Sequence, residues 1–314
     1  MNKTTTQLTT EQMALYMSIL NKYERYRNLS EEEKENLIIE ITSATYIDLL
    51  CDWAFKHVFG HNKKNLIMLL NDLLSENILD IEYNPNESNV SRPNDKHIIM
   101  DVVCHTSDRS FIVEMQRAKN EDFKNRMLYY GASLYSRQLK PRDSYNKLVP
   151  VYVICFMNFR LSHQTNQLVY KYQMREQDSG ELYGRQLSVF FCELPRFSAQ
   201  ASETKTPVEE WFDILRNMRN FAKKPSTVSK RFDPIFEACQ LDGLKNREPE
   251  QYFQAMISEE EKRGIAAAYY EDGFEDGAMK TKVSIAKRLL ASGSAMDFVV
   301  SVTGLTEEQI LSQD

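Results

Sequence analysis

Two short apolar segments, each with one acidic residue inside it, constrain the fold of this chain most. They are 98–104 (Ile-Ile-Met-Asp-Val-Val-Cys) and 111–116 (Phe-Ile-Val-Glu-Met-Gln). The five residues 106–110 between them are polar, which predicts two β-strands joined by a tight hairpin. A register symmetric about Ser107 and Asp108 places Asp101 directly opposite Glu114. Gln116 shares their face, because strand residues two apart point the same way.

Two carboxylates that face each other across a pair of strands repel, and burial makes the repulsion stronger. A divalent cation bound between Asp101 and Glu114 would remove this cost, so the pair is a candidate metal site. A second interpretation stays open. A lone acid in an edge strand is commonly a solvated residue or one that prevents aggregation.

Composition is that of an ordinary water-soluble protein, and it sets broad limits. The chain has 314 residues, 42% hydrophobic and 27% charged, and a net charge of −6. This length fits one large domain or two modest ones. The acidic total argues against a protein coated in positive charge, although nucleic-acid binding depends on local patches and is not excluded.

Several features indicate a cytoplasmic protein. The five cysteines occur singly without a CxxC pair, which favours a reducing compartment over a disulfide framework. The first twelve residues lack the apolar core of a signal peptide, and no run approaches the eighteen apolar residues of a membrane span.

The order of patterns along the chain predicts an α/β fold in three parts. Residues 1–45 read as a helical extension, 46–200 as the core, and 201–314 as a mainly helical C-terminal region. Within the core we expect a mixed β-sheet flanked by helices. Its predicted elements are helices over 46–76, a strand at 78–83, the hairpin described above, a helix over 120–140, a buried strand over 149–156 and a second hairpin over 165–194.

The residues around the hairpin resemble those of the PD-(D/E)xK nuclease superfamily. The closer resemblance is to its transposase-associated branch, the Rpn recombination-promoting nucleases, and it extends over residues 46–314. Five stretches carry it in order, and they are 52–60 (D-x-x-F-K-x-x-F-G), 95–101, 112–116 (I-E-x-Q in place of D/E-x-K), 126–130 (R-x-x-x-Y) and 145–150 (Y-x-x-L-x-P).

The sequence departs from the family pattern at two places. Gln116 stands where the wider superfamily has lysine, although the branch commonly has glutamine there. Arg142-Asp143 stands where the branch usually has a glycine before the tyrosine.

The resemblance implies a restriction-endonuclease-like fold and hydrolysis of DNA phosphodiester bonds. Asp101 and Glu114 would hold Mg²⁺, with Mn²⁺ as an alternative ion, and a bound water would become the nucleophile. Gln116 can orient that water but supplies no charge. A cation from elsewhere would then help, and the candidates are Lys56, Lys96 and Arg126. Asp52, one helical turn before Lys56, is either a further acid of the site or simply its i,i+4 ion-pair partner.

A basic strip, residues 117–142, follows the hairpin and predicts contact with DNA phosphates. It starts directly after Gln116 and contains seven basic residues, with only two acids among them. The other interpretation is a solvated helix face. With Lys96, the DNA-binding candidates nearest the site are Arg117, Lys119, Lys124 and Arg126.

The sequence contains little support for other functional classes, such as zinc enzymes. His57 and His61 have a spacing that zinc can use, but no HExxH motif accompanies them. We therefore predict a metal-dependent DNA endonuclease linked to mobile-element recombination. The alternative is a catalytically impaired relative that binds DNA or protein in a toxin–antitoxin or phage-defence system. We also expect contacts between copies of the chain through its C-terminal helices.

Overall fold

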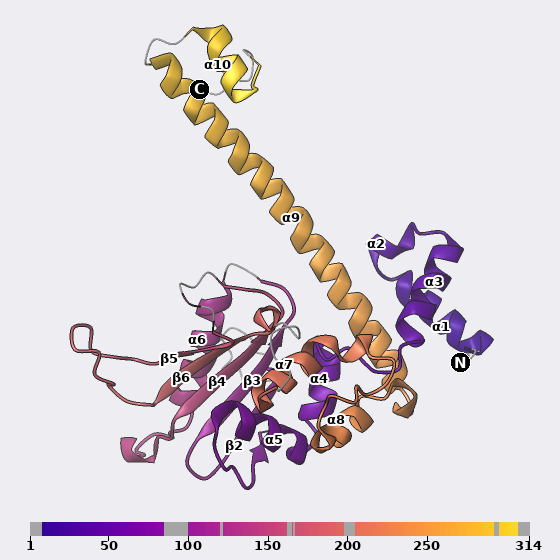
Figure 1. Ribbon diagram of the computed structural model, residues 1–314, viewed down its shortest axis with the longest axis vertical. Coiled ribbons are helices and arrows are strands. Elements are labelled where there is room, and N and C mark those ends of the chain that lie inside the picture. The colour runs from indigo at the N-terminus through magenta and orange to yellow at the C-terminus, as the bar shows by residue number, and fades with distance from the viewer. Residues whose placement is uncertain are drawn as a thin grey trace. The chain divides into compact units, whose positions relative to one another are not determined.

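A computed structural model shows the chain as two compact units, Met1–Ile257 and Ser258–Asp314 (Figure 1). It describes residues 8–84, 100–119, 122–161, 165, 167–197, 205–291 and 295–306. The side chains of 261–280 and 291 lie outside this description. The three-part division expected from the sequence stays a prediction. Side chains from all three parts, such as Ile38, Phe55 and Trp211, meet in one core of the first unit.

The first unit begins with helices that carry clear start signals. Ser30 begins α3 with a capping box, because its hydroxyl accepts a hydrogen bond from the Glu33 backbone and the Glu33 carboxylate accepts one from the Ser30 backbone. The helices before the sheet are α1 (Thr10–Leu20), α2 (Glu24–Arg27), α3 (Glu31–Thr42), α4 (Asp52–Phe59) and α5 (Lys63–Leu74).

A six-stranded mixed sheet forms the centre of this unit. Its order is β1-β2-β3-β4-β6-β5, with β3, β4 and β6 parallel and the other pairs antiparallel. The parallel strands are almost wholly buried, as expected of strands covered on both faces. The strands are β1 (Glu82–Tyr83), β2 (Val102–His105), β3 (Ser110–Gln116), β4 (Val151–Met157), β5 (Val169–Tyr172) and β6 (Leu187–Glu193).

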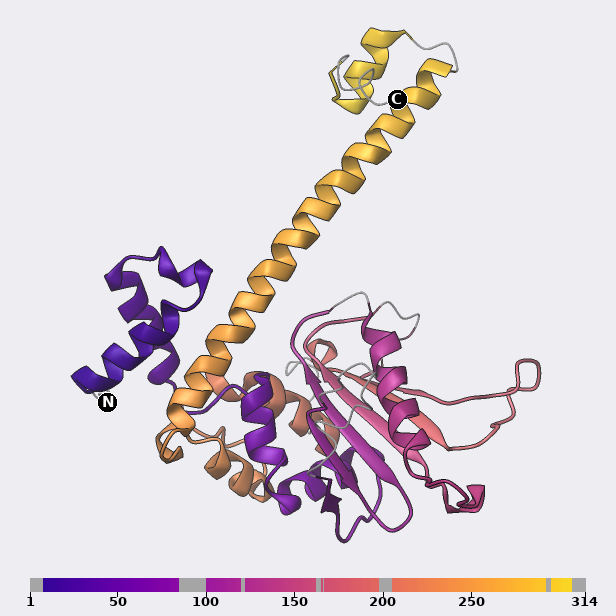
Figure 2. The same cartoon turned by 180° about the vertical axis from the view of Figure 1, so that it is seen from behind.

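Helices cover the two faces of the sheet separately (Figures 1 and 2). On one face lies α6 (Phe123–Ser136), and on the other lie α4, α5 and α7 (Pro207–Asn217). The helix α6 approaches the sheet closely at Gly131, where a Cβ atom would lie 2.8 Å from Val153 Cγ2 and 2.5 Å from Leu187 Cδ1. Alternation along β3 divides its side chains between the faces, since Ile112 joins the α6 side and Val113 the other.

The fold class predicted from the sequence is confirmed, whereas several strand limits were wrong. The first strand covers only Glu82–Tyr83 instead of 78–83. In the first hairpin strand, pairing begins at Val102, and Met100 and Asp101 precede it. Residues 98 and 99 lie outside the described residues. The predicted register is correct, because Val102 pairs with Val113 and Val103 with Ile112.

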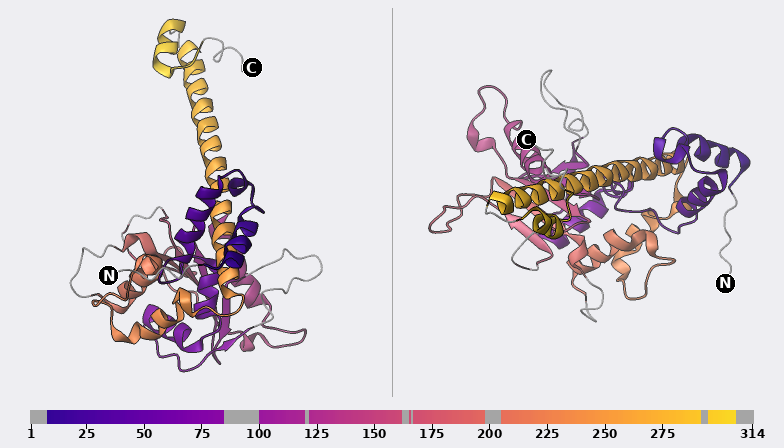
Figure 3. Two further views of the ribbon diagram at one scale, coloured as in Figure 1. Left: turned by 90° about the vertical axis from the view of Figure 1, so that its right-hand side faces the viewer. Right: turned by 90° about the horizontal axis from the view of Figure 1, so that it is seen from above.

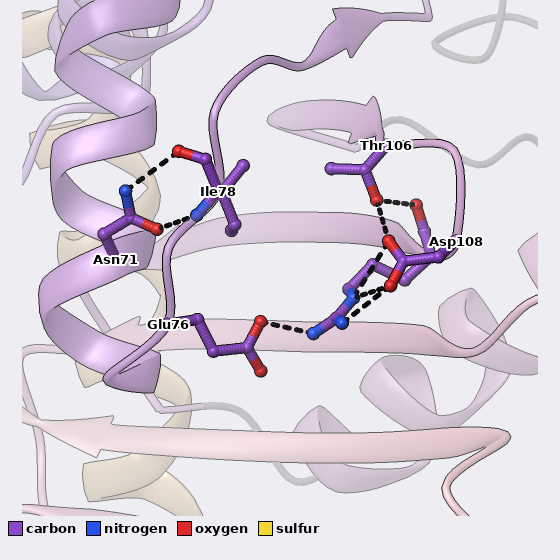
Figure 4. Close-up of polar contacts among 6 residues, drawn as sticks. Asn71, Glu76, Ile78, Thr106 and Asp108 are labelled. Atoms are coloured by element: carbon purple, nitrogen blue, oxygen red, sulfur yellow. Dashed lines mark hydrogen bonds and ion pairs between the residues drawn. The ribbon is translucent and has the colours of Figure 1, made fainter.

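Arg109 fixes the far end of this hairpin, away from its acids. Its guanidinium pairs with Asp108 in the turn and with Glu76 after α5 (Figure 4). Asn71 exchanges two side-chain hydrogen bonds with the backbone of Ile78 in the same region. These contacts hold the β2–β3 turn against the connection that leads into the sheet.

The elements described after α7 are helices. After α8 (Asp233–Ala238), α9 runs over Glu248–Ala291 and α10 over Met296–Thr303, and α9 passes from the first unit into the second (Figure 3). The second unit has a small apolar cluster that includes Val283, Ala286 and Val299. In the part of the chain that the structure describes, no helix combines the length and apolar content needed to cross a membrane.

Candidate active site

The two acids of the hairpin lie together at one end of the sheet. Glu114 is on β3, two residues beyond Ile112, so its side chain points to the α6 face. Asp101 directly precedes Val102, which pairs with Val113, and its backbone N–H donates to the Glu114 carboxylate, so the two acids adjoin as the predicted register requires. The Glu114 residue is only 2% exposed, and the Asp101 side chain is 9% exposed.

Each carboxylate has one oxygen held by the backbone of the other strand. The Asp101 backbone N–H donates to Glu114 Oε1 at 3.0 Å, and the Met115 N–H donates to Asp101 Oδ2 at 2.8 Å. The remaining oxygens, Asp101 Oδ1 and Glu114 Oε2, face side chains with N–H donors. The backbone therefore fixes both acids while leaving one oxygen of each to a cationic or amide partner.

Burial raises the pKa of both carboxyl groups and so favours their protonated forms. Burial raises the pKa of Asp101 well above its usual range, and the charge of Glu114 raises it further. Burial also raises the pKa of Glu114 to about 7, against the opposing effects of the Asp101 N–H, Arg126 and Lys56. At neutral pH the site therefore opposes the full ionisation of this pair.

Helix α6 brings Arg126 and Tyr130 close to Gln116 and Glu114. An Arg126 Nη donates to Gln116 Oε1, and Gln116 Nε2 lies 3.4 Å from Glu114 Oε2 as a long donor contact. The Arg126 Nε atom is buried and makes no hydrogen bond within the described residues. Burial raises the pKa of Tyr130, and the charge of Glu114 adds to this shift. A chain of polar contacts thus runs from Arg126 through Gln116 to the acids.

Helix α4 contributes a second cation from the other side. Lys56 Nζ lies 2.8 Å from Asp52 Oδ1 and 3.3 Å from Asp101 Oδ1. Burial lowers the pKa of Lys56, but Asp101 and Asp52 outweigh this effect, so its pKa is raised and it is charged. Both interpretations of Asp52 are therefore compatible with the geometry, because it is the i,i+4 partner of Lys56 and also lies near Asp101.

The donor set fits a hard divalent cation that keeps several water ligands. Within the described residues, no group of three or more His, Cys, Asp or Glu side chains is arranged to hold a metal. Mg²⁺ needs only one or two carboxylates when waters and substrate phosphates complete its shell. Asp101 Oδ1 and Glu114 Oε2 are the oxygens that would meet it, and their mutual repulsion is the feature that such a cation would relieve.

The residues of the predicted basic strip point in different directions in the structure. Arg126 points into the site, whereas Arg117 turns inward, with its Nη1 3.2 Å from Asp48 Oδ2. Lys119 and Lys124 are exposed near the ends of β3 and α6. Lys96 lies outside the described residues. The order of charges along the sequence could not distinguish these orientations, because it does not tell which side chains point into the protein and which toward solvent.

Two residues of this region had not been singled out as candidates. Tyr130 follows Arg126 by one helical turn, and the R-x-x-x-Y spacing is a signal that could have identified it. Asp48 had no such signal, because it is a single acid among apolar residues. Its buried position became visible only with the packing of α4 and β3.

A mixed sheet that carries two adjoining acids at one end, with cations from helices on both faces, defines a restriction-endonuclease-like α/β protein. Residues 49–267 match the family model described as PD-(D/E)XK nuclease family transposase. This match covers more than half of the chain, so the chain belongs to that family. The predicted family is confirmed, although the match ends at residue 267 while the expected resemblance continued to 314. No curated protein matches the chain.

Membership of this family indicates a nuclease and implies DNA as its partner. Nucleases of this superfamily generally use divalent metal ions. The residue assignments, the identity of the ion and the role in the cell remain proposals.

Proposed function

We propose that this chain is a divalent-metal-dependent DNA endonuclease in which Asp101 and Glu114 hold the metal. The observation that carries the proposal is the pair itself, two buried acids in which backbone N–H groups hold one oxygen of each and leave Asp101 Oδ1 and Glu114 Oε2 to side-chain partners. Burying two repelling carboxylates destabilises a fold unless a cation joins them in the working state.

The chain's own residues then have distinct tasks in hydrolysis. A bound divalent cation supplies positive charge to the phosphate and lowers the pKa of its water. Gln116 orients the attacking water through its side-chain amide, since its carbonyl oxygen is already held by Arg126. The orientation of this amide follows from that contact. The amide nitrogen is left on the side of Glu114, where the water would lie.

Arg126 and Lys56 supply the positive charge that Gln116 lacks. Arg126 lowers the pKa of Glu114 and holds Gln116, so it acts on a metal-binding acid and on the residue that orients the water. Lys56 faces Asp101 Oδ1, and it would contact the phosphate or the metal's water shell when the site is loaded. Lys119 and Lys124 are exposed and would bind flanking phosphates.

The remaining parts of the proposal follow from family membership and from the sequence. We assign Mg²⁺ as the working ion, with Mn²⁺ able to replace it. The family description connects the chain to transposases, and we place its activity in mobile-element recombination in the cytoplasm. Contacts between copies through the C-terminal helices stay a prediction.

Plasmid cleavage with purified protein tests the proposal directly. Supercoiled DNA is incubated with Mg²⁺, with Mn²⁺ or with chelator, using the wild type, Asp101→Asn and Glu114→Gln. We expect nicked and linear products with either ion, none with chelator, and a loss of at least about 100-fold in each variant. Cleavage that persists in chelator or in either variant contradicts the assignment.

Two matched variants control for the effect of removing a buried acid. Asp213→Asn and Glu210→Gln change residues that are 7% and 8% exposed and that lie outside the site. Both should cleave like the wild type when corrected for folded fraction. If the wild type retards DNA in a gel but never cleaves it, the catalytically impaired binding protein is the correct function instead.

A further inference from the structure

Asp48 lies outside the site described above but connects the two elements that form it. It is 6% exposed and sits in the turn before α4. Its Oδ1 accepts a hydrogen bond from the Leu50 N–H at 3.0 Å, and its backbone carbonyl accepts one from the Cys51 N–H at 2.9 Å. The side chain therefore shapes the turn from which α4, with Asp52 and Lys56, begins.

The other oxygen of Asp48 reaches the end of β3. Asp48 Oδ2 lies 3.2 Å from Arg117 Nη1, and the two side chains are 8% and 16% exposed. Arg117 directly follows Gln116, whose side chain contacts Glu114. One carboxylate thus joins the start of the helix that carries Lys56 to the end of the strand that carries Glu114.

A third contact joins this turn to the start of α9. The Asp48 backbone N–H donates to the hydroxyl of Tyr252 at 3.0 Å, and Tyr252 is 1% exposed. The Tyr252 ring also lies 5.9 Å from the ring of Trp53, measured between centroids, on the first turn of α4. The three contacts of Asp48 therefore leave it little freedom to move independently of α4 and β3.

We propose that Asp48 is a positioning residue which, through Arg117 and Tyr252, sets the separation between Lys56 and the Asp101–Glu114 pair. The expected effect of Asp48 on cleavage rests on the proposed nuclease function. The family match begins at residue 49, so Asp48 is outside the matched region. A buried ion pair contributes little net stability, because desolvation offsets its attraction, and geometric specificity is the better reason for its presence.

Two measurements on the full chain test this role. The first is the single-turnover rate of plasmid cleavage at saturating DNA and Mg²⁺, together with the KM for DNA. The second is hydrogen exchange of the backbone amides of 52–59, which needs no activity. The variants are Asp48→Asn, Arg117→Met, their combination and Tyr252→Phe, with Asp213→Asn as the control for loss of a buried acid.

We expect Asp48→Asn to lower the rate by about 100-fold with an unchanged KM, because a displacement of about 1 Å at a reacting group has this effect. The double variant should be no slower than the slower single variant, since both changes break one contact. Tyr252→Phe keeps both charges and should fold even if the others do not. It should slow cleavage by about tenfold, as expected for one lost hydrogen bond. Exchange over 52–59 should increase in these variants but not in Asp213→Asn.

The proposal is overturned if folded Asp48→Asn and Tyr252→Phe cleave within twofold of the wild type. Unchanged exchange over 52–59 in both variants overturns it as well. A wild type that does not cleave contradicts the nuclease function, and the exchange measurement then decides the structural role of Asp48 alone.

Discussion

At the scale of single residues, folding changes the environment of Glu114 strongly, because its carboxyl group becomes buried. Its pKa rises from 4.5 to about 7 on folding, mainly through burial. The folded state therefore binds more protons than the unfolded state between these values. By linkage, this residue's contribution to the free energy of unfolding decreases as pH rises through that window.

Glu114→Gln should therefore stabilise the protein while abolishing cleavage. Above pH 7 we expect a gain of about 2 kcal/mol in the free energy of unfolding, which disappears below pH 4.5. Denaturant titrations of both proteins at pH 4.5, 6 and 8 measure the difference. Glu210→Gln, which loses an acid paired with Arg231, should show no such gain. A variant less stable than the wild type at pH 8 would contradict the strain ascribed to the pair.

Arg126 should control the pH at which the site becomes active. It lowers the pKa of Glu114, so Arg126→Met raises that pKa and moves the rise of the pH–rate profile to higher pH. It also releases Gln116, and we expect a rate about 100-fold lower at pH 7. Initial cleavage rates between pH 5.5 and 9 at a fixed Mg²⁺ concentration measure both effects. A lower rate with an unmoved profile would mean that Arg126 acts only on the substrate.

At the scale of elements, the hairpin shows how far local pattern can lead. Its register was predictable, because five polar residues between two apolar segments leave few ways to join them, and it placed Asp101 opposite Glu114 correctly. The start of the first strand was wrong, because the apolar pattern continues before Val102 while the pairing does not. The sheet order was not predicted, since parallel pairing of β3, β4 and β6 depends on contacts between distant segments.

The loop after α6 contains a strained backbone residue at a position where the sequence departs from the family pattern. Arg142, where the family usually has a glycine nearby, has φ +75°, a left-handed conformation that costs a side-chain-bearing residue about 1 kcal/mol. Arg142→Gly should therefore raise the free energy of unfolding by about 0.5–1 kcal/mol. Ser144→Gly, at a residue with φ −78°, should give no gain. Equal effects in a denaturant titration would remove the backbone explanation.

At the scale of the whole molecule, the helices before the matched family region are part of the first unit's core. Leu20 at the end of α1 is fully buried, and the core it joins also contains Phe55 of α4. Leu20→Ala should lower the free energy of unfolding by about 2–5 kcal/mol. Leu15→Ala on the same helix should have a small effect, because Leu15 is 40% exposed. Thermal unfolding of both variants measures the contrast. An equal loss would show that α1 does not pack as described.

The site combines residues of one hairpin with residues of two helices, and the sequence alone could not predict how these helices approach the hairpin. The acids and Gln116 lie in one hairpin and were found from it, whereas Lys56 and Arg126 come from helices on opposite faces of the sheet. Their approach depends on how α4 and α6 pack, and so does the inward turn of Arg117 toward Asp48. Long-range packing decides which member of a basic strip reaches the site.

The most direct test of the metal site is a crystal of the protein soaked with Mn²⁺ and measured for anomalous scattering. We expect a peak between Asp101 Oδ1 and Glu114 Oε2, about 2.0–2.2 Å from each oxygen. The peak should be absent from crystals of Glu114→Gln treated in the same way. A manganese ion bound elsewhere, with Lys56 still in contact with Asp101 and no density between the two acids, would contradict the assignment.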